Sequence, residues 1–214
     1  MTLEHICGVG LLLALAACAT APAADDLAAY PASLVGTYDN AAQLRDAPDD
    51  LKRPPVADDT YDWIDLQTLT VRSVDAPAIG PHVVYAEWRD AEGAVSRQRL
   101  WSFRQDSQAA RLDFYSLKDR AADAAGFAAL KSEDVVGYGA SCSLTITSRG
   151  RGAWNAQTDT DACHTKSQDG RELIIDARVT VMPTGVLYQE TGKLADGGYA
   201  FRIPGGAPYD FRRK

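Results

Sequence analysis

Alternating apolar and polar positions run through most of the chain after residue 65. In residues 173–181 every second residue is apolar, and Asp176 and Arg178 lie between them. Because successive side chains of a strand point to opposite faces, this period of two predicts a strand with one buried face. Related patterns predict further strands at Leu66–Val74, His82–Arg89, Arg97–Gln105, Leu112–Leu117, Ser143–Ser148, Gly152–Thr158, Val186–Thr191 and Tyr199–Ile203.

The segments between these strands contain turn and helix signals. Residues 90–93 (DAEG) and 149–152 (RGRG) each predict the turn of a hairpin. Residues 26–38 predict a short helix limited by Gly36, and the alanine-rich residues 120–131 predict the best helix of the domain. Residues 47–59 predict a loop, because two consecutive prolines interrupt them. Strands spaced by about ten residues with glycine-rich turns are typical of an antiparallel barrel or sandwich.

The N-terminus has the pattern of a secretion signal that ends at a lipidated cysteine. An apolar run in residues 6–17 is too short to span a bilayer, and residues 15–18 (LAAC) resemble the bacterial lipobox. We therefore expect a signal peptide in residues 1–17 and a lipid anchor on Cys18. Residues 18–34 would form a tether with a short helix, and residues 35–214 a single domain. The alternative is an ordinary secretory signal that is cleaved nearby.

The net charge restricts the classes of partner, and the residue after Cys18 indicates the cellular location. The chain carries 22 basic and 29 acidic residues, a net charge of −7, which argues against nucleic acid as a partner. Attachment to a membrane would come from acyl chains rather than from a basic patch. Ala19 follows the cysteine in place of the aspartate that retains lipoproteins in the inner membrane. We therefore expect the cell envelope, with the outer membrane facing the periplasm as the default.

The cysteines predict one disulfide. Cys7 would leave with the signal peptide and Cys18 would carry lipid, so Cys142 and Cys163 remain as a pair in an oxidising compartment. Their Cα atoms should then lie within about 7 Å of each other. Two free thiols are the alternative.

Motifs for metal binding or nucleophilic catalysis are weak in this sequence. Only His82 and His164 follow the signal segment, and they lie in different segments, so we expect no metal site. No GxSxG motif supports a serine nucleophile.

The first predicted hairpin holds the most suggestive side chains. Tyr85 and Glu87 share one face of the first strand, and Arg97, Arg99 and Trp101 share one face of the second. If Glu87 pairs with Arg99, one face of the sheet carries an acid, a base and two aromatic rings. A slip of one residue would instead pair Glu87 with the intervening glutamine. The sequence leaves both registers open, and a solvated ion pair is the simpler interpretation.

Short motifs in a fixed order extend this observation over residues 35–214. They are GTYDNAAQ (36–43), YAE (85–87), RQR (97–99), FY (114–115), the series Cys142, Trp154 and Cys163, and PYDFRR (208–213). In order and spacing they resemble the CpcT/CpeT family of chromophore lyases. The resemblance implies a mainly β, calycin- or lipocalin-like antiparallel barrel with one or two short helices, often as a homodimer. It also implies binding of a linear tetrapyrrole and its transfer to a protein cysteine through a thioether.

The resemblance also suggests roles for individual residues. Glu87 would be the catalytic group that protonates or orients the pyrrole nitrogens, and Arg97 and Arg99 would bind the propionates. The remaining candidates for the ligand site are the aromatic Tyr38, Tyr85 and Trp101, which could stack on the rings, and Asn40 and Gln43, which could bond either the ligand or nearby backbone.

Export and a disulfide depart from a lyase that acts on a cytoplasmic client. We therefore expect a barrel on the cell envelope that binds a small, partly apolar or bilin-like ligand, without assuming lyase activity. A true lyase with an envelope acceptor is one alternative. A structural or assembly lipoprotein whose barrel is filled by its own side chains is another.

Overall fold

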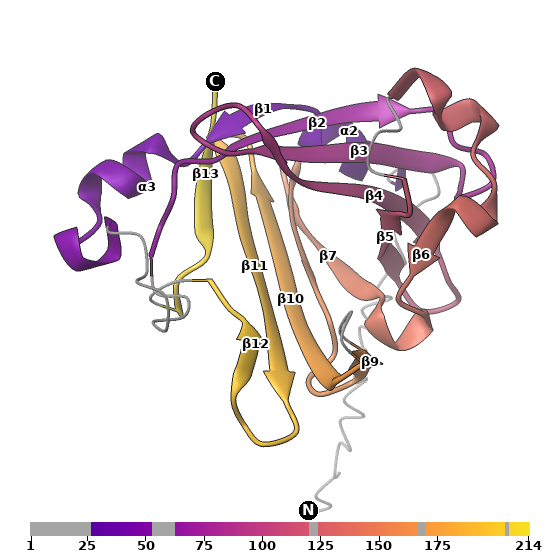
Figure 1. Ribbon diagram of the computed structural model, residues 1–214. Helices are drawn as coiled ribbons and strands as arrows, with labels where there is room; N and C mark the ends of the chain where they lie inside the picture. Colours follow the sequence, from indigo (N-terminus) through magenta and orange to yellow (C-terminus); the bar gives the residue numbers. More distant parts are fainter. Residues whose placement is uncertain (1–26, 53–62, 120–123, 167–169, 204–205) are drawn as a thin grey trace, which may run out of the picture.

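The computed structural model describes residues 27–52, 63–119, 124–166, 170–203 and 206–214 (Figure 1). Within these ranges, ten antiparallel strands form a barrel in which β10 pairs with β11 to close the circle. Around the barrel the order is β11-β13-β1-β2-β3-β4-β5-β7-β8-β10. This confirms the mainly β, calycin-like barrel. The bounds are β1 (Gly36–Asp39), β2 (Thr68–Val74), β3 (His82–Arg89), β4 (Val95–Gln105), β5 (Ala110–Leu117), β7 (Leu144–Gly150), β8 (Ala153–Gln157), β10 (Glu172–Met182), β11 (Gly185–Leu194) and β13 (Tyr209–Arg213).

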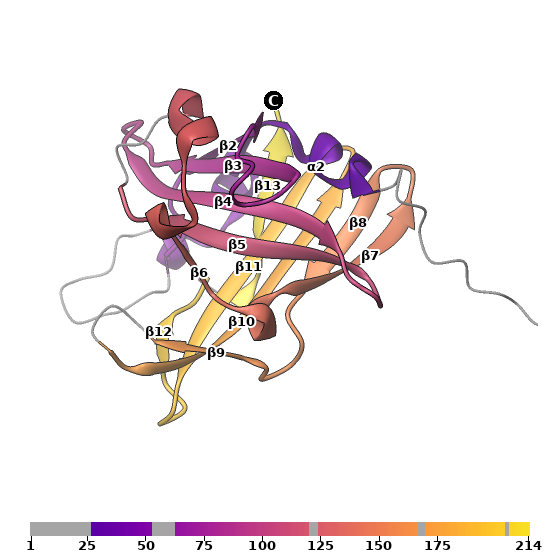
Figure 2. The ribbon, with the colours of Figure 1, turned by 90° about the vertical axis from the view of Figure 1, so that its right-hand side faces the viewer.

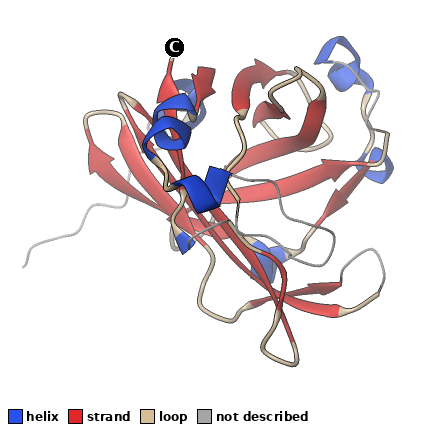
Figure 3. Ribbon diagram, turned by 60° about the vertical axis from the view of Figure 1, so that its left-hand side comes forward, coloured by secondary structure: helices blue, strands red, loops and turns tan. Residues whose placement is uncertain are grey.

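Three short strands extend the barrel wall at one end, and short helices lie in the connections (Figure 3). β6 (Val135–Gly137) pairs with β5, β9 (Cys163–Lys166) with β10, and β12 (Tyr199–Phe201) with β11. The described helices are α2 (Ala29–Leu34), α3 (Ala41–Asp46), and the 3-10 turns η1 (Asp49–Lys52), η2 (Ala124–Ala129), η3 (Ser132–Asp134) and η4 (Ala140–Cys142).

The alanine-rich segment is the clearest departure from the predicted elements. In place of a helix over 120–131, the structure has the 3-10 turn η2, and residues 120–123 lie outside the described ranges. The amide of Leu130 donates to the carbonyl of Phe127, and the Phe127 side chain is fully buried. The segment therefore adopts a 3-10 turn that buries the Phe127 ring, although its alanines favour an α-helix. The predicted helix over 26–38 is also shorter, because α2 ends at Leu34 and β1 begins at Gly36.

Large aromatic side chains fill one end of the barrel. Trp88, Trp101, Phe103 and Trp154 are each at most 2 % exposed and belong to the main buried cluster. The Trp154 indole donates to the hydroxyl of Ser33 at 2.8 Å, so α2 lies against this end, near the β7–β8 hairpin (Figure 2). Each buried aromatic side chain contributes about 1.5–3 kcal/mol of burial energy, so this end anchors the barrel.

A second buried cluster lies on the outer face of β3, β4 and β5. Tyr85, Leu100 and Phe127 belong to it, and the rings of Tyr85 and Phe127 are 5.0 Å apart. η2 therefore packs against the outside of the barrel wall.

The predicted signal peptide and the lipidation site Cys18 lie outside the described residues. None of the described helices has the length and apolar character needed to cross a bilayer.

Candidate functional site

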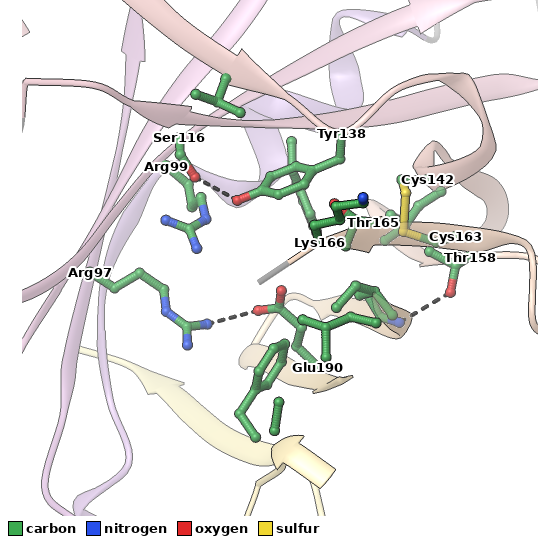
Figure 4. A pocket seen from close by; sticks show the side chains of 18 of the residues that line it. Arg97, Arg99, Ser116, Tyr138, Cys142, Thr158, Cys163, Thr165, Lys166 and Glu190 are labelled. Atoms are coloured by element: carbon green, nitrogen blue, oxygen red, sulfur yellow. Dashed lines mark hydrogen bonds and ion pairs between the residues drawn. A yellow bond between two sulfur atoms is a disulfide. The ribbon is translucent and has the colours of Figure 1, made fainter. Parts of the chain in front are cut away.

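A cavity of about 890 Å³ lies at the end of the barrel that the aromatic cluster leaves unfilled (Figure 4). β4, β5 and β6 line one side, and β9 to β12 line the other. Small side chains keep the space open, among them Ser116, Thr158 and Ala177. Apolar side chains form much of the remaining wall, including Phe114 and Ile175. The cavity therefore combines the size and mixed lining that small-molecule sites show, roughly 300–1,000 Å³.

The register of the β3–β4 hairpin decides which predicted residues face this cavity. Glu87 pairs with Gln98, and Trp88 pairs with Arg97. Residues paired across a sheet share a face, so Glu87 and Tyr85 lie on the opposite face from Arg97 and Arg99. Of the two registers that the sequence left open, the structure has the one that separates the acid from the arginines.

Arg97 forms hydrogen bonds and an ion pair with neighbouring residues inside the barrel. Its Nη1 lies 2.8 Å from Oε2 of Glu190 and 3.2 Å from the hydroxyl of Tyr188. The guanidinium also lies over the rings of Trp88 and Tyr188, 5.8 and 6.0 Å from their centroids. Burial alone would lower the pKa of Arg97, but the neighbouring Tyr188 and Glu190 more than offset it and the pKa is raised. Arg97 thus remains a cation at the cavity wall with its charge already balanced.

Tyr188 marks the boundary between the filled and hollow ends of the barrel. Its hydroxyl donates to Oε2 of Glu190 at 2.6 Å, and its ring stacks on Trp101. Burial raises the pKa of Tyr188, and the adjacent Glu190 raises it further, so this hydroxyl stays protonated and can donate at neutral pH.

Arg99 is a cavity cation whose charge has no partner among the described residues. Its Nη1 donates to the carbonyl of Gln98 at 2.9 Å, and in the described part of the chain it forms no ion pair. A guanidinium has five N–H donors, so several remain available. Figure 4 shows the Arg99 side chain directed into the space between the two walls.

Further basic residues surround the cavity. Lys118, Lys166 and Arg171 also line it, whereas Glu190 is the single acid among its described lining residues. Lys166 pairs with Glu172 at 3.1 Å, but both side chains are about two-thirds exposed and this pair is weak. The cavity is therefore basic in a protein whose net charge is −7.

The predicted disulfide is present and borders the cavity. Cys142 and Cys163 are bonded with their Cα atoms 4.3 Å apart, and both line the cavity. The bond ties η4 to β9, beside a seam where β5 and β7 share only two residue pairs, Arg111 with Thr145 and Leu112 with Leu144. It therefore reinforces the wall beside this short ladder.

Glu87 and Tyr85 form a separate network on the outer face. The Tyr85 hydroxyl donates to Oε2 of Glu87 at 2.7 Å, and Arg89 donates to Oε1 at 2.7 Å. The Gln98 amide donates to the Tyr85 hydroxyl. Burial first, and then Glu87, raise the pKa of Tyr85 to about 12. Both Glu87 oxygens are thus occupied, away from the cavity.

Three of the other predicted ligand residues bond neighbouring parts of the fold, and the fourth, Trp101, is buried in the barrel. The Tyr38 hydroxyl donates to the Leu34 carbonyl and accepts from Arg213. Asn40 bonds the backbone of Asp65 and Gln67, as one of its two proposed roles required. Gln43 bonds the backbone of Pro208 and Asp210, and Trp101 lies one layer beneath the cavity, against Phe114.

Of the predicted ligand and catalytic residues, the structure therefore brings Arg97 and Arg99 to the cavity. It adds Glu190, Tyr138 and Phe114, which sequence reasoning did not assign. A signal for Glu190 exists, because Val186, Tyr188 and Glu190 follow the same period of two in a predicted strand. In the described ranges, no group of three or more His, Cys, Asp or Glu side chains is placed to hold a metal ion.

Comparison with known proteins adds a likeness of fold. No protein-family profile and no curated protein matches the sequence. The solved structure of the selenomethionine CRL protein of Arabidopsis is similar with a TM-score of 0.64 at 14 % identity. The match covers 89 % of this chain and 98 % of that one. At this identity, the likeness extends to the fold alone.

Proposed function

We propose that this chain is a binding protein whose barrel holds a small, partly apolar organic anion. The observation that carries the proposal is Arg99, a cation without a carboxylate partner in a cavity of about 890 Å³ with apolar walls. A buried or half-buried guanidinium gains most from an oxyanion that it can grip with two N–H groups.

The walls and the charge define the two parts of the ligand. Phe114, Leu173 and Ile175 offer apolar surface for its body. The excess of basic side chains around the cavity would attract its charged group, even though the protein as a whole is acidic.

A linear tetrapyrrole is our first candidate, because it combines apolar rings with propionates and because residues 35–214 resemble the CpcT/CpeT lyases. Lyase activity is not part of the proposal, since the predicted catalyst Glu87 lies on the other face of the sheet. The size of the cavity argues against the alternative of a barrel filled by its own side chains.

In this proposal, a lipid on Cys18 holds the barrel on the cell envelope. The LAAC sequence of residues 15–18 supports it. Incorporation of labelled palmitate into the wild-type protein, and its loss in Cys18→Ser, is the expected result. Equal labelling of both would overturn the anchor.

Titration of the purified protein with biliverdin tests the binding proposal. We expect a one-to-one complex, visible by absorption and native mass spectrometry, with quenching of the tryptophans beneath the cavity. Arg99→Gln should weaken binding about tenfold, because a hydrogen bond to a charged group is lost. Arg178→Gln is the matched control, since it removes the same charge from an exposed position on β10.

Biliverdin dimethyl ester distinguishes the charged part of the ligand from its body. If the ester binds as tightly as the acid, and Arg99→Gln changes neither affinity, the anion is not what the cavity recognises. If no bilin, haem breakdown product or lipid binds at all, the proposed function fails.

A further inference from the structure

Glu190 presents an unused oxygen to the cavity. Its side chain is 15 % exposed and lines the cavity on the side opposite Arg99 (Figure 4). It reaches this position because β11 points Tyr188 and Glu190 inward, and the paired residue on β10 is the small Ala177. No large side chain therefore covers the carboxylate.

The two oxygens of Glu190 have different surroundings. Oε2 accepts hydrogen bonds from Arg97 at 2.8 Å and from Tyr188 at 2.6 Å. Oε1 has no hydrogen-bond partner among the described residues, although an ionised carboxylate can accept about four bonds. Arg97 and Tyr188 thus hold the carboxylate in one orientation and leave one oxygen toward the cavity.

Arg97 and Arg99 consequently have different roles, although they lie two residues apart on one strand. Arg97 balances and orients Glu190, whereas Arg99 is available to an anion. The cavity therefore presents two complementary groups to a ligand: a positively charged hydrogen-bond donor, Arg99, and a negatively charged hydrogen-bond acceptor, Glu190.

We propose that Oε1 of Glu190 accepts a hydrogen bond from an N–H or O–H group of the bound ligand. This inference rests on the proposed function, and it restricts the ligand to amphipathic anions that also carry a hydrogen-bond donor. A simple fatty acid satisfies Arg99 but removes water from Oε1 without replacing its hydrogen bond. Sites built around a buried polar group discriminate strongly against ligands that leave it unpaired.

The test compares two probes with the wild-type protein and three variants. Biliverdin carries carboxylates and pyrrole N–H groups, and oleate carries a carboxylate only. We expect wild type to bind biliverdin more tightly. Glu190→Gln releases the Arg97 cation, which attracts both carboxylate probes alike. The preference for biliverdin over oleate should therefore fall about tenfold, because a charge-assisted hydrogen bond becomes a neutral one.

Two further variants separate recognition from structure. Glu87→Gln makes the same change on the outer face of the barrel and should leave both affinities unchanged. Tyr188→Phe removes a donor to Oε2 but spares Oε1, so the preference for biliverdin should persist. Thermal unfolding of each variant shows that it folds.

Several outcomes would overturn the inference while the proposed function stands. Tighter binding of oleate than of biliverdin by wild type would do so. An unchanged ratio of the two affinities in Glu190→Gln would remove Oε1 from recognition and assign Glu190 a structural role only. If neither probe, nor any related anion, binds wild type, the proposed function itself has failed.

Discussion

The two ends of this barrel are built from the same strands and differ in what those strands carry. Along β4, Trp101 and Phe103 point into the filled end, and Arg97 and Arg99 point into the hollow end. Along β10 the inward residues change from the fully buried Val179 and Val181 to Ala177, Ile175 and Leu173, which line the cavity. A single ladder of hydrogen bonds therefore supports an aromatic core and a basic cavity only a few residues apart.

The filled end mainly stabilises the fold, and the hollow end mainly provides the proposed ligand site. Aromatic packing at the filled end can hold the barrel closed, so the hollow end need not contribute a core of its own. The disulfide and the Arg97–Glu190 pair restrain the hollow end instead. Truncation of single side chains should consequently reduce stability mainly at the filled end and binding mainly at the hollow end.

Truncation at the filled end should have the largest effect on stability. We expect Trp101→Ala to lower the free energy of unfolding by about 3–5 kcal/mol, because it leaves a cavity in a close-packed cluster. Phe201→Ala, which removes a half-buried ring from the cavity wall, should cost about 1 kcal/mol. Urea denaturation measures both. Similar losses would show that the hollow end is as important to stability as the filled one.

Loss of the disulfide should have the next largest effect. Its sulfurs join residues 21 positions apart, so the double variant Cys142→Ser, Cys163→Ser should lose about 3 kcal/mol through the entropy of the unfolded chain. Because β9 and η4 line the cavity, biliverdin binding should weaken as well. Wild type treated with dithiothreitol should behave like the variant. Unchanged binding after reduction would mean that the seam holds without the bond.

The alternation of apolar residues predicted eight of the ten barrel strands, missed β1 and β13, and left the register of one hairpin open. β3 has the predicted bounds His82–Arg89. Near the turn, however, Arg89 pairs with Val95 and a register shift follows between Trp88 and Arg89. If the pairing of Arg89 with Val95 continued without a bulge, Glu87 would lie opposite Arg97 and on the same face of the sheet. The one extra residue of the bulge instead places Glu87 on the face opposite the arginines. A bulge leaves no periodic signal in the sequence.

The candidate site was predicted in part for the same reason. Arg97 and Arg99 were found because they share one face of a predicted strand and match the RQR motif. Glu190 was missed because its role depends on Arg97, which is 93 residues away in the sequence. Contacts of that range follow from closure of the barrel, which local patterns do not specify.

Alkaline pH should probe the boundary between the two ends. The pKa of Tyr188 is raised in the folded protein, so the unfolded chain loses this proton first, at its ordinary value near 10. Stability should therefore fall as pH rises above 10, by at most about 1.4 kcal/mol for each pH unit from this group. Urea denaturation between pH 9 and 11 should show a shallower fall in Tyr188→Phe. Equal slopes would mean that the pKa of Tyr188 is the same in the folded and unfolded states.

The smallest effect on stability should come from the exposed ion pair at the rim. Glu172→Gln removes the partner of Lys166, and exposed pairs contribute between about 0 and 1 kcal/mol. The same change makes the mouth of the cavity more basic, so an anionic probe should associate faster at low ionic strength, and salt should abolish the difference. Stopped-flow quenching with biliverdin measures this rate, and Glu92→Gln, an exposed acid in the β3–β4 turn, is the matched control. If both variants accelerate association equally, overall charge attracts the ligand. Acceleration in Glu172→Gln alone would locate that attraction at the hollow end.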